Sequence, residues 1–290
     1  MLPQRGEPAP DAPRQPLDVK AFGLTDVGCV RESNEDQFLV ADLAKTMRIW
    51  HTSLPEPKVR FGNERGHLFL VADGMGGHNG GECASAMAVA AIEQFTLNTF
   101  KWFFHPGGPD AQRVLAQFQT AMREAEARIF EESAEHPELH GMGTTVTMAY
   151  HLDSQLCIVH AGDSRAYMFE GGELKQVTRD HTVVAELVRQ GSLEPGDARR
   201  HRFRNLITNV VGGNEALHFV EAHALQLQAG DRLLLCSDGL TEMLTNDAIA
   251  ATLRDESDPE AACRKLVGQA NDAGGRDNVT VVIARFDAAV

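Results

Sequence analysis

The sequence predicts an α+β fold in which helices cover a layered core of antiparallel strands. Short apolar runs that suit strands occur in two blocks, and segments with helical spacing lie between the blocks and after the second one. The chain has 290 residues, of which 43% are hydrophobic and 23% are charged, so it can bury the core of one large domain or of two small ones.

The first block consists of three apolar runs that suit strands, at residues 22–27, 38–40 and 68–71. Between the last two runs, the polar and proline-bearing segment 43–66 is interpreted as a surface insertion. Two long helices are expected next, because residues 80–103 are rich in alanine at helical spacing and residues 111–135 have apolar side chains at intervals of three and four.

The second block changes to a period of two. Residues 145–150 alternate, and apolar runs at 156–159 and 166–169 follow before a Gly-Gly turn, which predicts an antiparallel meander over 145–170. Residues 181–213 form a predicted flap that begins with helical and turn-rich sequence. The rest of the chain predicts two strands, two helices and a last strand, at residues 217–225, 232–236, 246–254, 259–272 and 279–286.

Composition limits the functional classes. The chain has 27 lysine and arginine residues against 41 aspartate and glutamate residues, and its net charge of -14 opposes binding to nucleic acid or to anionic lipid. No apolar stretch is long enough for a membrane helix and no apolar signal segment occurs, so a cytoplasmic protein with no membrane partner is expected. The five cysteines are scattered without a C-x-x-C pair, which suits free thiols in a reducing compartment.

Proline sets the N-terminal segment apart. Residues 1–16 hold five of the twelve prolines among polar residues, which is too little apolar surface to offset the entropy of ordering. We therefore expect residues 1–18 to form a disordered arm and residues 19–290 to form a single domain.

Five short acidic motifs recur along the chain, in the order R-x-x-N-E-D, D-G-M-G-G, G-D-S-R, S-D-G and G-R-D-N. Asp73 and Asp238 each follow an apolar run and precede a glycine, and Asp277 stands just before the last predicted strand. Strand ends can therefore deliver three carboxylates to one place, and glycine lets a backbone carbonyl approach an ion. Because no histidine or cysteine cluster accompanies them, these oxygen ligands favour magnesium or manganese over zinc.

A single Asp-Gly pair is usually only a turn, so this interpretation depends on the joint occurrence of the motifs. Together with G-M-G-T-T and G-x-D-N-V-T, their order resembles that of the metal-dependent serine/threonine protein phosphatases, the PPM or protein phosphatase 2C-like family, in its compact bacterial form. The resemblance covers the chain from about residue 20 to 287. It implies a four-layer α/β/β/α sandwich in which two antiparallel sheets are flanked by helices.

The resemblance also implies a set of metal ligands. Asp73 is expected to bridge two manganese or magnesium ions. Asp238 and Asp277 complete the coordination of one ion, and the carbonyl of Gly74 is a ligand of the other. Asp163 matches a residue that, together with the equivalent of Asp238, holds a third and weaker metal in bacterial members.

Four neighbouring residues receive supporting roles from the same resemblance. Glu35 and Asp36 match acidic positions that hold metal-bound waters or ligate directly, and Asn278 is expected to orient the ligand beside it. Arg31 matches the arginine that grips the substrate phosphate, and its planar guanidinium can bind two phosphate oxygens. Clustered aspartates alone would repel a phosphate ester, so the site is expected to be inactive without cations.

One position departs from many eukaryotic relatives. They have a histidine where this sequence has Met75, and a methionine cannot transfer a proton. His78 is the nearest replacement, and it either protonates the departing serine oxygen or only orders its loop. Similarly, the basic stretch at 199–204 in the predicted flap either steers phosphopeptides or forms a solvated face.

The resemblance thus implies a catalytic domain that hydrolyses phosphoserine and phosphothreonine in proteins by metal-activated water. Such an enzyme would oppose a serine/threonine kinase in signalling, and we expect it to be a monomer. Two alternatives stay open on the residues: a catalytically weak pseudophosphatase that binds phosphoproteins, and a small-molecule phosphatase. A cysteine-based phosphatase is unsupported, because none of the five cysteines has the C-x5-R spacing.

Overall fold

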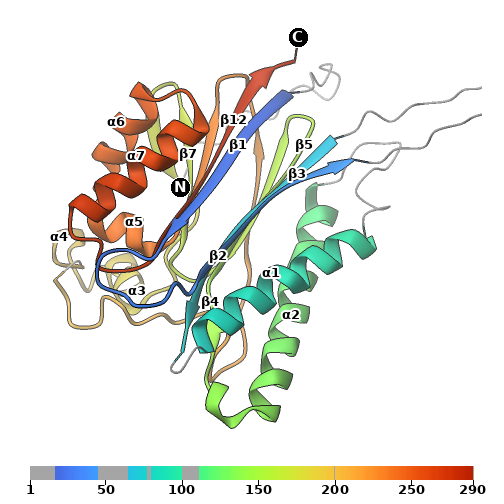
Figure 1. Cartoon of the computed structure of the whole chain (residues 1–290), viewed down its shortest axis with the longest axis vertical. Coiled ribbons are helices and arrows are strands. Elements are labelled where there is room, and N and C mark those ends of the chain that lie inside the picture. The colour runs from blue at the N-terminus through green and yellow to red at the C-terminus, as the bar shows by residue number, and fades with distance from the viewer. Residues whose placement is uncertain (1–16, 45–64, 77–79, 100–110, 199, 290) are drawn as a thin grey trace, which may run out of the picture.

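The computed structural model describes residues 17–44, 65–76, 80–99, 111–198 and 200–289. These residues form four layers in the order helix, sheet, sheet, helix, which confirms the predicted fold class (Figure 1). Within this described part, every helix is too short or too polar to cross a membrane.

The larger sheet has seven strands, and all of its pairs are antiparallel. The strands follow the order β10-β6-β5-β3-β4-β9, and β2 also pairs with β3. They are β2 (Asp36–Ala44), β3 (Arg65–Met75), β4 (Gly143–Thr144), β5 (Val146–Leu152), β6 (Gln155–Ala161), β9 (Val211–Gly212) and β10 (Glu221–Gln226).

The smaller sheet has five antiparallel strands in the order β1-β12-β11-β7-β8. It brings the first described strand of the chain beside the last one. The strands are β1 (Leu17–Asp26), β7 (Arg165–Glu170), β8 (Glu173–Gln176), β11 (Arg232–Cys236) and β12 (Val279–Ala288).

The predicted meander over 145–170 is wrong at one point. Strands β5 and β6 form a hairpin as expected, but β7 pairs with β11 and β8 in the other sheet and not with β6. The chain changes sheet at Gly162, whose positive φ of 120° suits glycine and whose added Cβ would lie 2.5 Å from the Thr145 side chain. This crossing places Asp163 where the two sheets meet.

Two groups of helices cover the outer faces of the sheets (Figure 1). Helices α1 (Gly80–Thr99) and α2 (Ala111–Glu135) pack on the larger sheet, and α5 (Asp238–Met243), α6 (Asn246–Asp255) and α7 (Pro259–Asp272) pack on the smaller one. Sequence signals explain where α7 begins, because the Asp258 carboxylate accepts a hydrogen bond from the Ala261 N–H and proline follows at the first helical position. Shorter helical turns are the 3-10 helix Pro137–Leu139 and, between β8 and β9, α3 (Val183–Arg189) and α4 (Pro195–Ala198).

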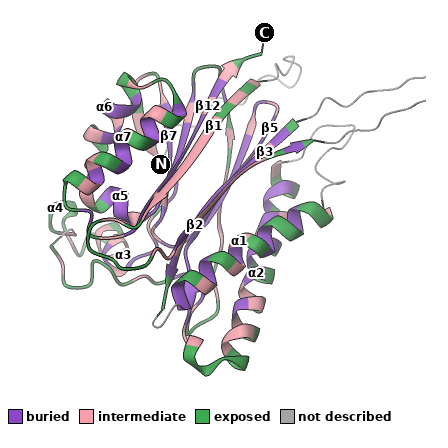
Figure 2. Cartoon of the chain, in the orientation of Figure 1, coloured by how far each residue is buried: buried purple, intermediate pink, exposed green. Residues whose placement is uncertain are grey.

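Three apolar layers fill the spaces between these four layers (Figure 2). Strand β3 shows the principle: Leu68 and Leu70 pack toward α1 and α2, whereas Phe69 and Val71 pack toward the smaller sheet. This alternation is what a strand buried on both faces requires. Three of the five free cysteines are buried in these layers, namely Cys157, Cys236 and Cys263.

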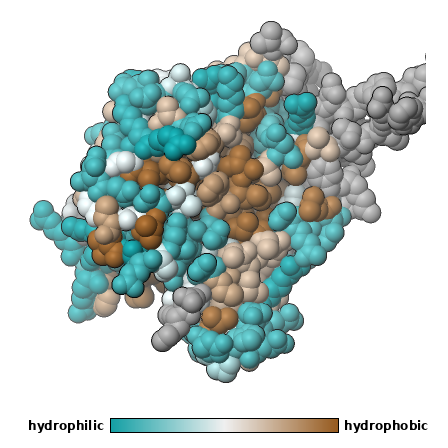
Figure 3. Space-filling view, in the orientation of Figure 1, coloured by the Kyte–Doolittle hydropathy of each residue, from teal (hydrophilic) through white to brown (hydrophobic). Residues whose placement is uncertain are grey.

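The strands extend slightly beyond their predicted limits. Leu17 pairs with Ala288, so residues 17–18 belong to β1 and not to the predicted arm, while residues 1–16 lie outside the described part. The predicted insertion 43–66 likewise loses two residues at each end to β2 and β3, and its residues 45–64 lie outside the described part. Figure 3 shows apolar side chains on this face over β1 and β2, where edge strands leave the layer between the sheets partly exposed.

Candidate metal centre

The acidic residues of the motifs lie together at one end of the layer between the sheets. Asp36 begins β2 and is directly opposite Asp73 on β3. Each continues a row of side chains that faces the smaller sheet, represented by Phe38 on β2 and Val71 on β3. Because side chains alternate between the two faces of a strand, both carboxylates are directed between the sheets and not toward α1 and α2.

The smaller sheet supplies the other carboxylates. Asp238 is the first residue of α5, two positions after the end of β11, and Asp277 comes two positions before β12. Asp163 lies in the crossing from β6 to β7. The electrostatic effect of Asp36, Asp163, Asp238 and Asp277 on Asp73 shows that segments far apart in the sequence converge on one site.

Asp36 connects the two sheets through hydrogen bonds. Its Oδ2 accepts a bond of 2.7 Å from the hydroxyl of Ser237, just after β11, and another of 2.7 Å from the hydroxyl of Thr280 on β12. Burial raises the pKa of Asp36 to about 6, even though both hydroxyls act in the opposite direction.

Burial and mutual repulsion disfavour ionisation throughout the cluster. Burial, followed by the neighbouring carboxylates, raises the pKa of Asp73 and of Asp238 well above the ordinary range. Burial and the charge of Asp180 raise the pKa of Asp163 to about 7, and Arg165 offsets only part of this change. Such desolvated carboxylates are unfavourable without nearby cations, and their all-oxygen donor set fits hard divalent ions.

Glycine is required where backbone segments meet beside these carboxylates. A Cβ added at Gly74 would lie 2.1 Å from the carbonyl oxygen of Gly81 at the start of α1 and 2.7 Å from that of Glu35. A Cβ added at Gly239 would lie 2.0 Å from the carbonyl oxygen of Asn278. The glycines of the D-G motifs therefore allow the segments that carry the carboxylates to approach one another.

Asn278 holds the loop between β1 and β2. Its Nδ2 donates hydrogen bonds to the carbonyls of Val27 at 3.0 Å and Ser33 at 2.9 Å, and its Oδ1 accepts one from the Glu35 N–H at 2.8 Å. Only its backbone N–H contacts Asp277, at 2.9 Å from Oδ1. The side chain therefore orients the loop that carries Arg31 and Glu35, in addition to the local contact that the sequence predicted.

Arg31 reaches the edge of the acidic cluster. Its Nη2 lies 2.7 Å from Oδ2 of Asp277, and its side chain is 52% exposed. The Glu35 side chain lies over the first turn of α1, because a Cβ at Gly81 would be 2.7 Å from the Glu35 carboxyl carbon. The site thus has one half-exposed guanidinium at its mouth and a buried acidic floor.

Sequence reasoning missed the hydroxyl groups that fix the acidic residues. Besides Ser237 and Thr280, the Thr144 hydroxyl donates to the Asp73 carbonyl at 2.9 Å, and the Asp73 N–H donates to the Thr145 hydroxyl at 3.0 Å. All four hydroxyls lie within the motifs S-D-G, D-N-V-T and G-M-G-T-T. Their positions next to aspartates in these motifs are the sequence signal that could have identified them.

Two predicted features fall partly or wholly outside the described residues. His78 lies outside the described residues, and its role stays a prediction. In the basic stretch, Arg199 is also outside, whereas Arg204 lines a pocket that Asp238 shares.

A second cluster of potential ligands consists of His160, His181 and Glu221. The N–H of Gly162 and the Asn209 amide both donate to Nδ1 of His181, so its Nε2 carries the proton and donates to Glu221 at 3.2 Å. Nε2 of His160 donates to two backbone carbonyls at 3.0 and 3.1 Å. These atoms already have partners, so the cluster is a hydrogen-bond network and not a second metal site.

Comparison with known proteins agrees with this geometry. A sequence model of the family described as protein phosphatase 2C matches residues 59–269. The serine/threonine protein phosphatase PstP of Mycobacterium tuberculosis is 39% identical over 217 residues, which cover 75% of this chain and 40% of that protein. The serine/threonine phosphatase stp of Listeria monocytogenes is 33% identical over 220 residues, which cover 76% of this chain and 84% of that protein.

Solved structures give the same result. A structure of the catalytic domain of PstP in complex with two manganese ions superposes with a TM-score of 0.74 at 32% identity, covering 93% of this chain and 99% of that one. The chain spans less than half the length of the full mycobacterial relative, but nearly all of this catalytic domain.

Proposed function

Because the chain belongs to the protein phosphatase 2C family, we propose that it is a metal-dependent serine/threonine protein phosphatase. The observation that carries the proposal is the convergence of Asp36, Asp73, Asp238 and Asp277 from two sheets, with Arg31 at the mouth. We propose phosphoserine and phosphothreonine in proteins as the substrates.

The acidic cluster would hold two manganese or magnesium ions. Asp73 would be a ligand of both ions. Asp238 and Asp277 would complete the coordination of one ion, and the Gly74 carbonyl would be a ligand of the other. Asp163 with Asp238 would hold a third and weaker ion. When bound, the ions supply positive charge for the phosphate and Lewis-acid activation of a water nucleophile.

The remaining residues bind and orient the substrate. Arg31 is a half-exposed cation that pairs with Asp277 at the edge of the cluster, and it can turn from Asp277 to two oxygens of a phosphate ester. Asp36, fixed by Ser237 and Thr280, keeps one carboxylate oxygen in place for an ion or an ordered water. Glu35 and the loop held by Asn278 would orient waters around the ions.

We assign proton donation to the leaving oxygen to His78, since Met75 cannot perform it. Replacing His78 with alanine tests this assignment on two esters that differ in leaving group. A larger loss with the poor leaving group supports the role, and equal losses with both esters contradict it.

The cellular context is part of the proposal. Residues 17–290 would act as one catalytic domain with a flap at 181–213, and the protein would work as a cytoplasmic monomer. It would reverse the action of a serine/threonine kinase in bacterial signalling. The negative net charge of -14 agrees with a protein substrate rather than nucleic acid.

Hydrolysis assays on chelator-treated protein test the activity. We expect turnover of an aryl phosphate and of a phosphothreonine peptide after addition of manganese or magnesium, and none after chelation. The Asp238→Asn variant is the control for the metal site. Turnover that survives chelation, or turnover of sugar phosphates with none of the peptide, contradicts the proposal.

A further inference from the structure

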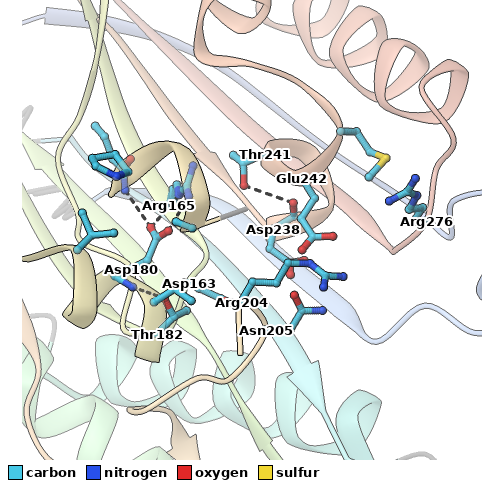
Figure 4. A pocket seen from close by; sticks show the side chains of 17 residues that line it. Asp163, Arg165, Asp180, Thr182, Arg204, Asn205, Asp238, Thr241, Glu242 and Arg276 are labelled. Carbon is cyan, nitrogen blue, oxygen red and sulfur yellow. Dashed lines mark hydrogen bonds and ion pairs between the residues drawn. The ribbon is translucent and has the colours of Figure 1, made fainter. Parts of the chain in front are cut away.

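A cavity of about 540 Å³ adjoins the metal centre on the side of the predicted flap (Figure 4). Its walls come from α3 and α4, from α5, and from the loop before β12, and both Asp163 and Asp238 line it. The cavity therefore starts at the proposed catalytic centre and extends away from it between helices that do not carry metal ligands, apart from Asp238 itself.

Most of the charged groups in this cavity already have a partner or a role. Arg165 binds Asp180 through two hydrogen bonds, of 2.7 Å from Nε and 2.5 Å from Nη2 (Figure 4). Asp163 and Asp238 belong to the proposed metal centre. Three charged lining residues are left, namely Arg204, Glu242 and Arg276.

Two of these three residues are arginines without a partner for the guanidinium. Both Arg204 and Arg276 are exposed, and among the residues that the structure describes neither guanidinium has a hydrogen bond or an ion pair (Figure 4). The same part of the chain pairs many of its other arginines, such as Arg31, Arg165 and Arg264. Unpaired cations beside a cavity are available to an anionic ligand.

The lining of the cavity also includes apolar side chains. They come from α3, α4 and α5, namely Val184, Ala185, Val188, Pro195, Ala198 and Met243. An extended peptide presents alternate side chains in opposite directions, so a cavity that offers both apolar side chains and unpaired cations suits a segment of polypeptide.

We propose that this cavity binds the residues that flank the phosphorylated side chain of a protein substrate, and that Arg204 and Arg276 select an anionic group among them. The anion is a carboxylate or a second phosphate group. This inference depends on the proposed phosphatase function. Arg276 directly precedes Asp277, and an extended chain advances about 3.3 Å per residue, so the selected group lies within a few positions of the phosphorylated residue.

Phosphothreonine peptides that differ only in flanking residues provide the test. One series places glutamate at each neighbouring position in turn, a second series places phosphoserine there, and the reference peptide has neutral glutamine. The readout is the ratio of kcat/KM between an anionic peptide and the reference peptide, measured on the same protein. This ratio cancels any general loss of activity that a substitution beside Asp277 causes.

We expect the wild-type protein to favour an anionic neighbour at one or more positions by about threefold to tenfold, the range of one charge-assisted contact. The double variant R204Q/R276Q brings the ratio toward one, and higher ionic strength lowers it in the wild type. Arg202, which lies over the Phe203 ring at 4.3 Å and does not line the cavity, provides the control R202Q with an unchanged ratio.

The two series separate the sources of the anion, since preference for glutamate identifies a carboxylate and preference for phosphoserine alone identifies a second phosphate. A wild-type ratio of one at every position overturns the inference, as does a ratio that the double variant preserves. A preference for lysine that Glu242→Gln removes also overturns it, because the single carboxylate would then select the substrate. If no phosphate ester is hydrolysed with manganese, the proposed function itself fails.

Discussion

The layer between the two sheets has an apolar middle and an acidic end, and the same strands build both. On β3, Phe69 and Val71 lie in the middle of the layer and Asp73 continues their row at its end. The middle buries apolar surface and stabilises the sandwich. The end buries carboxylates whose pKa values are raised by burial and mutual repulsion, so it lowers the stability of the metal-free protein.

This difference shows how one strand can serve two purposes without a change of geometry. Alternation directs every second side chain between the sheets, and only the residue type determines whether that position stabilises the fold or binds ions. The comparison predicts that substitutions four residues apart on the same face of β3 have opposite consequences for activity and for stability.

The largest expected effect is on activity. Asp73→Asn removes the carboxylate on which the four others converge, so we expect kcat/KM for an aryl phosphate to fall at least about a thousandfold, equivalent to about 4 kcal/mol of barrier. The metal-free variant should be at least as stable as the wild type, because one repelling buried charge is gone. Thermal denaturation with and without manganese checks this, with the exposed Asp247→Asn as control. A metal-free melting temperature lowered as much as in a core variant would contradict the comparison.

The apolar middle should respond in the opposite way. Phe69 is fully buried, and Phe69→Ala should lower the free energy of unfolding by about 3 to 4 kcal/mol. The additional stability that manganese provides should be retained, since no ligand changes. Chemical denaturation with and without manganese measures both quantities, and the milder Phe69→Leu should show a smaller loss. If manganese no longer stabilised either Phe69 variant, the apolar middle and the acidic end of the layer would not be independent of each other.

A hydroxyl that joins the two regions should have an intermediate effect. Thr280→Val keeps the shape of the side chain but removes the hydrogen bond to Asp36, so we expect about a tenfold weaker apparent affinity for manganese. Titration of the melting temperature with manganese measures it. Thr252→Val is the control, because Thr252 is buried and bonded to Gln269 in the outer helices. Equal shifts in both variants would refute a specific role for Thr280.

The last effect appears only at acidic pH and concerns His160, a neutral polar group in the same layer. Burial lowers the pKa of His160 from 6.5 to about 4. The folded state therefore resists protonation, and stability falls by about 1.4 kcal/mol per pH unit as the pH decreases between these two values. The carboxylates act in the opposite direction, since their raised pKa values favour the metal-free fold at lower pH.

The pH effect is therefore measured as a difference between variants. Free energies of unfolding across this range should show a shallower acid-side decline for His160→Gln than for the wild type. Parallel curves for His160→Gln and the wild type would exclude the assigned protonation behaviour.

The sequence predicted most of the helices and strands well because each depends on a local pattern. The continuous apolar run of β3 and the three- and four-residue spacing in α2 reflect which faces are buried. The exchange of β7 between sheets was not predictable in this way, since alternation is the same whichever sheet a strand joins. The torsion of Gly162 and the pairing of β7 with β11 decide it, and both are properties of the assembled molecule.

In the candidate site, too, local motifs predict some features and not others. Asp73, Asp238 and Asp277 were identified from their strand-end motifs, and the structure brings them together. The hydrogen bonds of Asn278 to Val27 and Ser33 span about 250 positions of sequence, and no local pattern encodes them. The ion pair of Arg31 with Asp277 is another contact of this kind, since it depends on the pairing of β1 with β12 at opposite ends of the sequence.

The crossing of the chain at residues 162–164 has a kinetic consequence. The proposed metal ligands come from both sheets at one end of the sandwich, so a half-assembled chain with a single sheet would lack the complete set that retains an ion. Bound divalent ions would then stabilise the native state without stabilising earlier, partly assembled states, and they would prolong the lifetime of the folded protein by slowing sheet separation while refolding keeps its rate.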